Sequence, residues 1–131
     1  MKLTDVELER FIAFTRYMVI SATECRMITY QELMDIFGLS RISQMGNFAG
    51  NLGTFCKSMK WPLLNSLIIN QTDYIPSDGY NEWIVGNTNT KSGEVTAEWG
   101  KEIVKCWKKF KNPKQKLKGL NKVIKDYFKE Q

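Results

Sequence analysis

Apolar residues from Ile42 to Met59 recur every three or four positions, which is the spacing of one face of an α-helix. Three glycines, Gly46, Gly50 and Gly53, lie beside this face at i, i+4 and i+7, so they share a stripe of their own. Each glycine inside a helix costs about 1 kcal/mol relative to alanine. We therefore expect the stripe to allow the close approach of another backbone, either of protein or of nucleic acid.

Two shorter helices are predicted before the glycine-bearing one. Each begins with a capping box, in which a threonine and a glutamate three residues later satisfy free backbone N–H groups. The boxes are Thr4 with Glu7, which starts a helix over residues 5–22, and Thr29 with Glu32, which starts a helix that ends at Gly38. We expect the second helix to bury Leu33, Ile36 and Phe37, and Ser40 to cap the glycine-bearing helix. Two short helices joined by a few residues that include a glycine are typical of a helix-turn-helix.

A pair of short strands is predicted after these helices. Residues 63–69 are rich in leucine and isoleucine and fit a buried strand. A loop with a proline and an Asp-Gly turn follows, and residues 83–85 fit a second strand. A strand pair after a helix-turn-helix forms a wing. The predicted fold class is therefore α+β, with a winged helix-turn-helix core at residues 27–85 and an N-terminal helix packed on it.

The positive charge is concentrated at the C-terminal end. Residues 101–131 contain eleven lysines and three acidic residues, so they carry a net charge of +8, whereas the whole chain carries +5 and the first hundred residues −3. Helices are predicted over residues 96–110 and 114–129. We therefore divide the chain into a winged-helix domain at residues 1–110 and a lysine-rich helical extension at residues 111–131, which we expect to act as an attached polycation.

Composition argues against several classes of protein. The 131 residues suffice for one domain with its own core. No apolar run approaches the length of about 18 residues that a transmembrane helix needs, and the charged start does not resemble a signal peptide. Three widely spaced cysteines and the lack of histidine argue against a disulfide framework, a zinc site and the commonest general base. We expect a cytoplasmic protein that is not an enzyme and holds no metal or cofactor.

The middle of the chain resembles the DNA-binding domain of the O6-alkylguanine-DNA alkyltransferases. The shared features are a Thr-Tyr-x-Glu-Leu segment, a small-residue recognition helix, a proline-containing strand and a glycine-tyrosine loop. In this chain they are Thr29–Leu33, Gly46–Gly53, Pro62–Leu64 and Asp78–Tyr80. The sequence is closer still to a group of small, uncharacterised bacterial and phage proteins that share Phe55-Cys56, Pro62-Leu63, Leu67–Asn70, Pro76 and Gly79-Tyr80. The resemblance implies a winged-helix fold and DNA binding.

The chain departs from the alkyltransferases at the reactive centre. That family carries a Pro-Cys-His-Arg nucleophile on the strand after the recognition helix, and this chain has Asn65–Asn70 there, without cysteine, histidine or arginine. Because a thiolate activated by histidine is the family's nucleophile, alkyl transfer is excluded. Alkyltransferase-like proteins without the cysteine keep an arginine that fills the gap left by a flipped base, and Arg41 lies about one turn early for that role.

The candidate binding residues lie mainly on the glycine-bearing helix. Its arginine, glutamine and asparagine residues are of the types that contact base edges and phosphates, although a solvated helix face would have the same composition. The resemblance aligns Tyr30 with a tyrosine that contacts the phosphate beside a flipped nucleotide; the alternative is a tyrosine that packs at a helix start. The candidates are Tyr30, Arg41, Ser43, Gln44, Gly46, Asn47, Gly50 and Asn51, with Lys114, Lys118 and Lys122 in the extension.

Two functions from different classes remain open on the sequence. The first is non-catalytic DNA binding, in which the glycine-bearing helix approaches the duplex and the lysines add phosphate affinity through counterion release. The alternative is a phage- or mobile-element-encoded interaction module that inhibits a host defence protein. The net negative charge of the first hundred residues favours this alternative. The amphipathic C-terminal helix would then serve for docking or for a homodimer.

Overall fold

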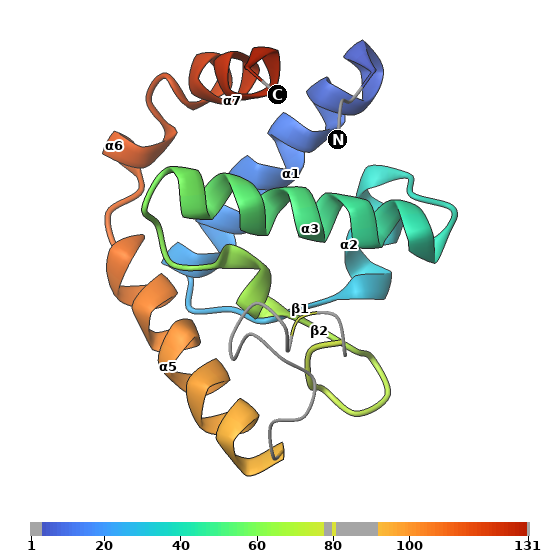
Figure 1. Cartoon of the computed structure of the whole chain (residues 1–131), viewed down its shortest axis with the longest axis vertical. Helices are drawn as coiled ribbons and strands as arrows, with labels where there is room; N and C mark the ends of the chain where they lie inside the picture. Colours follow the sequence, from blue (N-terminus) through green and yellow to red (C-terminus); the bar gives the residue numbers. More distant parts are fainter. Residues whose placement is uncertain (1–3, 78–79, 81–91, 131) are drawn as a thin grey trace.

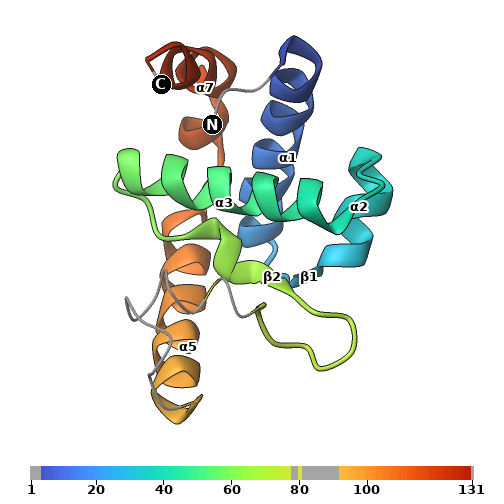
Figure 2. The same ribbon diagram turned by 45° about the vertical axis from the view of Figure 1, so that its right-hand side comes forward.

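The computed structural model describes residues 4–77, 80 and 92–130, which form a mixed α+β fold (Figure 1). In chain order the elements are α1 (Asp5–Thr23), β1 (Ile28–Thr29), α2 (Tyr30–Phe37), α3 (Ile42–Ser58), the 3-10 turn η1 (Leu64–Leu67), β2 (Ile68–Ile69), α5 (Ser92–Lys109), α6 (Lys114–Leu117) and α7 (Leu120–Lys129). Helix α3 crosses α1, α5 runs along one side, and α7 lies beside the start of α1 (Figures 1 and 2).

The first three helices form where the sequence predicts them. Both capping boxes are present at the starts of α1 and α2. Gly38 ends α2 in the left-handed conformation, with φ of 65°. The predicted cap of α3 is wrong, since α3 begins after Arg41, whose backbone N–H donates to Oε1 of Gln44 at 3.2 Å. Gln44 therefore satisfies the helix start in place of Ser40.

Two apolar residues near the turn between α2 and α3 do not face inward. Ile36 is 51% exposed and Ile42 is 69% exposed. Ile36 lies in the last turn of α2 and Ile42 is the first residue of α3. Leu33, one turn earlier on α2, is completely buried, and so is Met45, one turn later on α3. The helical period thus identifies the buried face correctly in the helix interiors and fails at the ends that project beyond the core.

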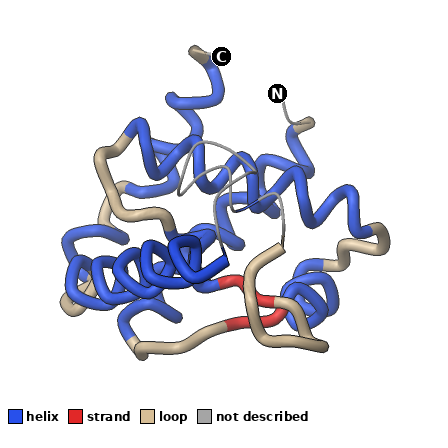
Figure 3. Tube along the Cα trace, turned by 60° about the horizontal axis from the view of Figure 1, so that its bottom comes forward, coloured by secondary structure: helices blue, strands red, loops and turns tan. Residues whose placement is uncertain are grey.

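The predicted strand over residues 63–69 is largely wrong, although the burial of that segment is confirmed. Residues Leu64–Leu67 form a 3-10 turn, and only Ile68–Ile69 is a strand. This strand pairs in parallel with Ile28–Thr29, with Ile28 opposite Ile68 (Figure 3). The second strand predicted at residues 83–85 lies outside the described residues. The small sheet instead ties the segment before α2 to the segment after α3.

The core is built around phenylalanine rings from several helices. The ring of Phe11 on α1 lies 5.7 Å from Phe48 on α3 and 5.2 Å from Phe128 on α7, in edge-to-face pairs. Phe14 contacts Phe37 on α2 in the same way, at 5.7 Å. Such pairs add about 0.5–1.5 kcal/mol beyond the burial of their apolar area. The aromatic cluster therefore joins the two ends of the chain into one core.

The C-terminal extension packs against the rest of the chain through its apolar residues. Its apolar residues Leu120, Ile124 and Phe128 are 2%, 0% and 9% exposed and belong to the common core. Arg16 on α1 donates to the carbonyl oxygen of Leu117 and to Oδ1 of Asn121, both at 3.2 Å. The predicted single helix over residues 114–129 is broken into α6 and α7 at Gly119, whose φ is 72°.

Candidate functional site

The glycine stripe of α3 divides between the interior and the surface. Gly53 is buried, whereas Gly46 is exposed and Gly50 is partly exposed. A Cβ atom built on Gly46 or Gly50 would meet no heavy atom of the described residues within 4 Å. Close packing against another of the described helices therefore does not explain these two glycines. They leave the backbone of α3 uncovered on its outer side.

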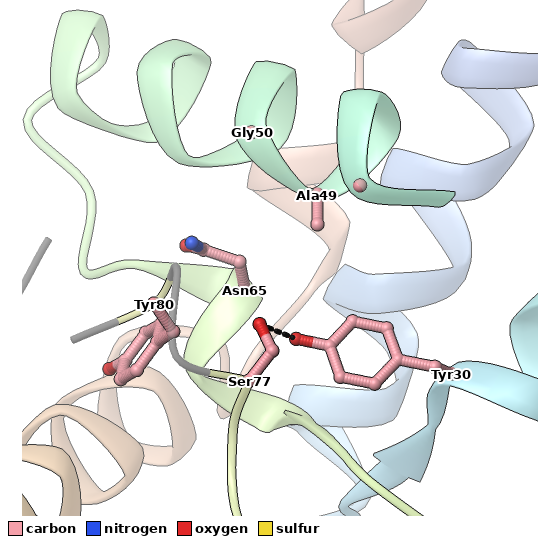
Figure 4. A pocket seen from close by; sticks show the side chains of 7 residues that line it. Tyr30, Ala49, Gly50, Asn65, Ser77 and Tyr80 are labelled. Carbon is pink, nitrogen blue, oxygen red and sulfur yellow. Dashed lines mark hydrogen bonds between the residues drawn. The ribbon is translucent and has the colours of Figure 1, made fainter. Parts of the chain in front are cut away.

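A pocket of about 170 Å³ opens directly beside these two glycines. Gly46, Ala49 and Gly50 of α3 form one wall, and residues from the segments around α2, η1 and β2 form the wall that faces it (Figure 4). The lining residues are Tyr30, Gly46, Ala49, Gly50, Asn65, Ser77 and Tyr80. Among the lining residues that the structure describes, none has a side chain that is charged at neutral pH.

Two of the polar groups of the pocket are already paired with each other. The hydroxyl of Tyr30 donates to Oγ of Ser77 at 3.0 Å, which ties the start of α2 to the segment after β2. The hydroxyl of Tyr80 forms a hydrogen bond with Oγ of Ser66. Burial is the main reason that the pKa of Tyr80 is raised, so this hydroxyl stays protonated at neutral pH. Both tyrosines are thus fixed in place as walls.

Asn65 differs from the hydroxyl-bearing lining residues, whose polar groups are paired. It is 5% exposed. Its Oδ1 is buried and has no hydrogen-bond partner among the residues that the structure describes. A buried acceptor without a partner costs about 1–3 kcal/mol, and in native proteins such atoms are few. Asn65 lines the pocket, but its unpaired Oδ1 is out of reach of solvent, so this atom is a buried acceptor of the scaffold.

The segment that carries Asn65 is held firmly by α5. The backbone N–H of Leu63 donates to Oε2 of Glu102 at 3.0 Å, and Nε1 of Trp99 donates to the carbonyl oxygen of Ser66 at 2.7 Å. The thiol of Cys106 lies 3.2 Å from the carbonyl oxygen of Leu63. These contacts lie on both sides of Asn65 in the sequence. Its position is therefore set by the scaffold.

The structure brings some of the predicted site residues together and leaves others apart. Tyr30, Gly46 and Gly50 line the pocket. Arg41, just before α3, and Ser43 and Asn47 on α3 are exposed, and Asn51 is partly buried, but none of these four lines the pocket. Gln44 caps α3 through Oε1. The residues that sequence reasoning missed are Ala49, Asn65, Ser77 and Tyr80.

The predicted lysines lie on the solvent side of the C-terminal segment. Lys114, Lys118 and Lys122 are all exposed. Nζ of Lys122 forms an ion pair with Oδ2 of Asp126 at 3.0 Å, a contact within one turn of α7. The apolar face of α7 packs against the core of the same chain. A homodimer or docking contact through that face, as the sequence suggested, is therefore not supported.

The thiols do not form a reactive centre. Cys56 and Cys106 are completely buried, and burial raises the pKa of Cys56 to about 12 and also raises that of Cys106. Both are protonated at neutral pH and are not nucleophilic thiolates. Within residues 4–77, 80 and 92–130, no group of three or more cysteine, aspartate or glutamate residues could hold a metal ion.

Comparison with protein families, with curated proteins and with solved structures found no match to this chain. Among the described residues, no helix is both long and apolar enough to cross a membrane. The pocket, the open face of α3 and the distribution of charge are the features of the chain that bear on its function.

Proposed function

We propose that this protein is a non-catalytic DNA-binding protein of the winged-helix type, in which α2 and α3 serve as the helix-turn-helix. The observation that carries the proposal is the pocket beside Gly46 and Gly50, which is also lined by the aromatic side chains of Tyr30 and Tyr80. The two glycines leave α3 smooth where a partner backbone would approach, because a Cβ atom on either would meet none of the described residues. The resemblance to the alkyltransferase DNA-binding domain supports the same use of this helix.

In the proposed complex, one unstacked base enters the pocket while α3 follows the adjacent backbone. Pockets for drug-sized ligands measure about 300–1,000 Å³. This pocket, at about 170 Å³, suits a single small planar group. Tyr30 and Tyr80 supply aromatic walls, as in other sites that hold an extruded base. The exposed Arg41, Ser43 and Asn47 are then free to contact phosphates and sugars.

The lysines of the C-terminal half would supply affinity that does not depend on sequence. Lys108, Lys109, Lys111, Lys114 and Lys118 are exposed, and within the described chain no carboxylate lies within 4.0 Å of any of their ammonium groups. Neutralising a phosphate with such a lysine releases a counterion, so the affinity falls with salt. Lys101 and Lys105 differ, because each already pairs with a glutamate.

The decisive experiment measures binding of labelled duplexes, either fully paired, mismatched or alkylated, by gel shift and anisotropy. We expect binding that weakens with salt, with a slope of log affinity against log salt that falls by about 0.9 for each phosphate contact removed by a Lys→Gln change. Lys101→Gln is the matched control, since this lysine is paired with Glu98. No binding of any duplex at low salt, about 50 mM, would refute the proposal.

A variant of Gly50 tests the open face of α3. The space beside Gly50 is empty, so Gly50→Arg should fold and should fill the mouth of the pocket. We expect it to lose preference for mismatched over paired duplexes, whereas Gly50→Ala retains most of that preference. Normal binding by folded Gly50→Arg would show that α3 does not approach the DNA.

The alternative function, a module that binds and inhibits a host defence protein, is favoured by a different observation. Ile36 and Ile42 are 51% and 69% exposed at the turn between α2 and α3. Arg41 and Lys57 are the only basic residues from Arg41 to Ser58, which is few for a DNA-contacting helix. If every duplex fails to bind, this exposed apolar turn becomes the surface to test, with Ile42→Ser as the first variant.

A further inference from the structure

The outer face of α2 carries negative charge that the described residues do not neutralise. We call it the acidic face, and its exposed side chains are Gln31, Glu32, Asp35 and Ile36. Oε1 of Glu32 accepts from the backbone N–H of Thr29 at 3.4 Å, and Oδ1 of Asp35 accepts from the amide of Gln31 at 2.9 Å. Among the described basic side chains, none lies within 4.0 Å of either carboxylate.

A pocket of about 380 Å³ opens on this acidic face. Its lining residues are Thr29, Gln31, Glu32, Asp35, Gln71 and Tyr74. Two carboxylates and two amide groups suit an ammonium group, and the ring of Tyr74 offers a surface for the methylene chain of a lysine. Tyr74 is 64% exposed and Ile36, next to Asp35, is 51% exposed. The acidic face therefore suits a partner surface in which lysines surround an aliphatic side chain.

Helix α5 of the same protein presents a surface of this kind. We call it the lysine stripe, and its exposed side chains are Lys101, Val104, Lys105 and Lys108, at i, i+3, i+4 and i+7. Val104 is 44% exposed among these lysines. Lys101 and Lys105 pair with glutamates of α5 itself, and exposed pairs of this kind are worth little, so they are exchanged at small cost.

The two surfaces lie on different sides of the molecule. In both Figure 1 and Figure 2, α2 is at the right and α5 at the lower left. The acidic face and the lysine stripe of one chain therefore do not cover each other. A second copy of the chain brings the opposite charge and an exposed aliphatic side chain to each surface.

We propose that this protein self-associates head-to-tail, with the acidic face of one copy docked on the lysine stripe of the next. Each copy uses each surface once, so the contact is heterologous and repeats into short chains of molecules. The proposal does not rest on DNA binding. Phosphates repel an acidic face, so the contact leaves α3 free for a duplex.

The first test measures mass in solution without DNA. Two short helical faces form a small interface, and small interfaces give weak, transient association. We expect the weight-average mass in sedimentation equilibrium to rise as the protein concentration is raised from about 10 μM to about 1 mM in about 50 mM salt. Salt at about 500 mM should weaken the association about tenfold, because it screens the charges of the two surfaces.

Variants with reversed charge identify the two surfaces. Asp35→Lys and Lys108→Glu should each weaken self-association about tenfold, since like charges then face each other. A mixture of the two variants should associate again, because the unchanged acidic face of one fits the unchanged lysine stripe of the other. Glu130→Lys and Lys129→Glu make the same changes in net charge at exposed residues outside both surfaces, and they should behave as the unchanged protein.

A second pair of variants leaves the charges in place. Ile36→Ser and Val104→Ser remove exposed aliphatic groups, so they should not affect folding and should weaken the association. Their mixture should associate again for the same reason as the charge variants. This pair decides the question if a charge variant does not fold, as followed by circular dichroism.

The outcomes separate a head-to-tail contact from the other possible occupants of the acidic face. A monomer at every concentration overturns the proposal, and binding of a labelled lysine-rich peptide by that monomer would assign the acidic face to a different basic partner. Association that the variants leave unchanged, or that the mixtures do not restore, would place the contact elsewhere and would also overturn it. Failure of every duplex to bind would refute the proposed function and leave this result as it stands.

Discussion

The outer face of α3 and the segment formed by α6 and α7 both present features suited to binding, but they are built in different ways. On α3, Gly46 and Gly50 have none of the described residues where a Cβ atom would lie, so this surface contributes little to the described fold. On α7, the lysines lie on the face exposed to solvent. The opposite face carries Ile124 and Phe128, which belong to the core. A binding surface can thus be either separable from the fold or part of it. Mutations should distinguish the two cases.

The largest effect is expected from deleting residues 112–131. In the sequence, Pro113 marks an apparent boundary at which to truncate the chain. The deletion, however, removes Leu120, Ile124 and Phe128 from the core. Burial of each such side chain is worth about 1.5–3 kcal/mol, so their joint loss approaches the total stability of a typical domain. We expect the truncated protein to lose cooperative unfolding, as measured by thermal and urea denaturation.

The matched control for this deletion keeps the apolar residues and removes charge. Replacing Lys114, Lys118 and Lys129 by glutamine should leave the urea midpoint nearly unchanged, because these side chains are exposed. A truncated protein that unfolds cooperatively at the same midpoint as the full chain would show that α6 and α7 are, after all, a separable extension.

The next effect concerns the packed protein interior beneath the open face of α3. Cys56 lies on the inner side of α3 and Cys106 on α5, and burial raises the pKa of Cys56 to about 12 and also raises that of Cys106. In the unfolded chain a thiol ionises near pH 8.5. Above that pH the unfolded state loses protons that the folded state keeps, so stability falls as pH rises. The expected loss is about 1.4 kcal/mol per pH unit for each thiol.

Two measurements check this prediction. Urea unfolding between pH 8 and 10 should show the decline, and a Cys56→Ala, Cys106→Ala variant should show a flatter dependence on pH. A maleimide at neutral pH should label Cys25, which is exposed, and should reach Cys56 and Cys106 only after denaturation. Labelling of either buried thiol in the native protein would mean that the interior beneath α3 opens readily.

Local signals in the sequence predicted much of the fold. The capping boxes at Thr4 and Thr29 and the left-handed Gly38 fixed the starts and ends of helices, because these signals involve residues only three or four positions apart. The strand pairing of Ile28 with Ile68 was not predictable in this way. It joins residues forty positions apart, and a buried apolar run does not distinguish a strand from a 3-10 turn.

The site was predictable only in part. Gly46, Gly50 and Tyr30 were found from periodicity and resemblance. Asn65 was seen as a residue that stands where a nucleophile is missing, but nothing in the sequence says that its amide oxygen is buried without a partner. That fact depends on the contacts that hold η1 against α5. The integration of the lysine-rich segment was missed for a similar reason, since an amphipathic pattern does not say what its apolar face covers.

A smaller effect is expected at Gly119, which separates α6 from α7. Its φ of 72° is a left-handed conformation that side chains other than glycine adopt at a cost of roughly 1–2 kcal/mol. Gly119→Ala should therefore lower the free energy of unfolding by about 1 kcal/mol, although the space around it is empty. Unchanged stability in urea would mean that the junction between the two helices tolerates another backbone conformation.

The smallest effect has the opposite sign and concerns the glycines of α3. Gly46 and Gly50 have ordinary helical conformations and open space where a Cβ atom would lie. Gly46→Ala and Gly50→Ala should therefore each raise the free energy of unfolding by up to about 1 kcal/mol, the difference in helix propensity. Gly53→Ala is the contrasting variant, since Gly53 is buried and an added methyl must find room in a packed interior, so we expect no gain there. Equal responses at the three positions would remove the distinction between an open outer face and a packed inner one. A gain at Gly46 and Gly50 together with weaker DNA binding would indicate that these glycines are kept for the partner and not for the fold.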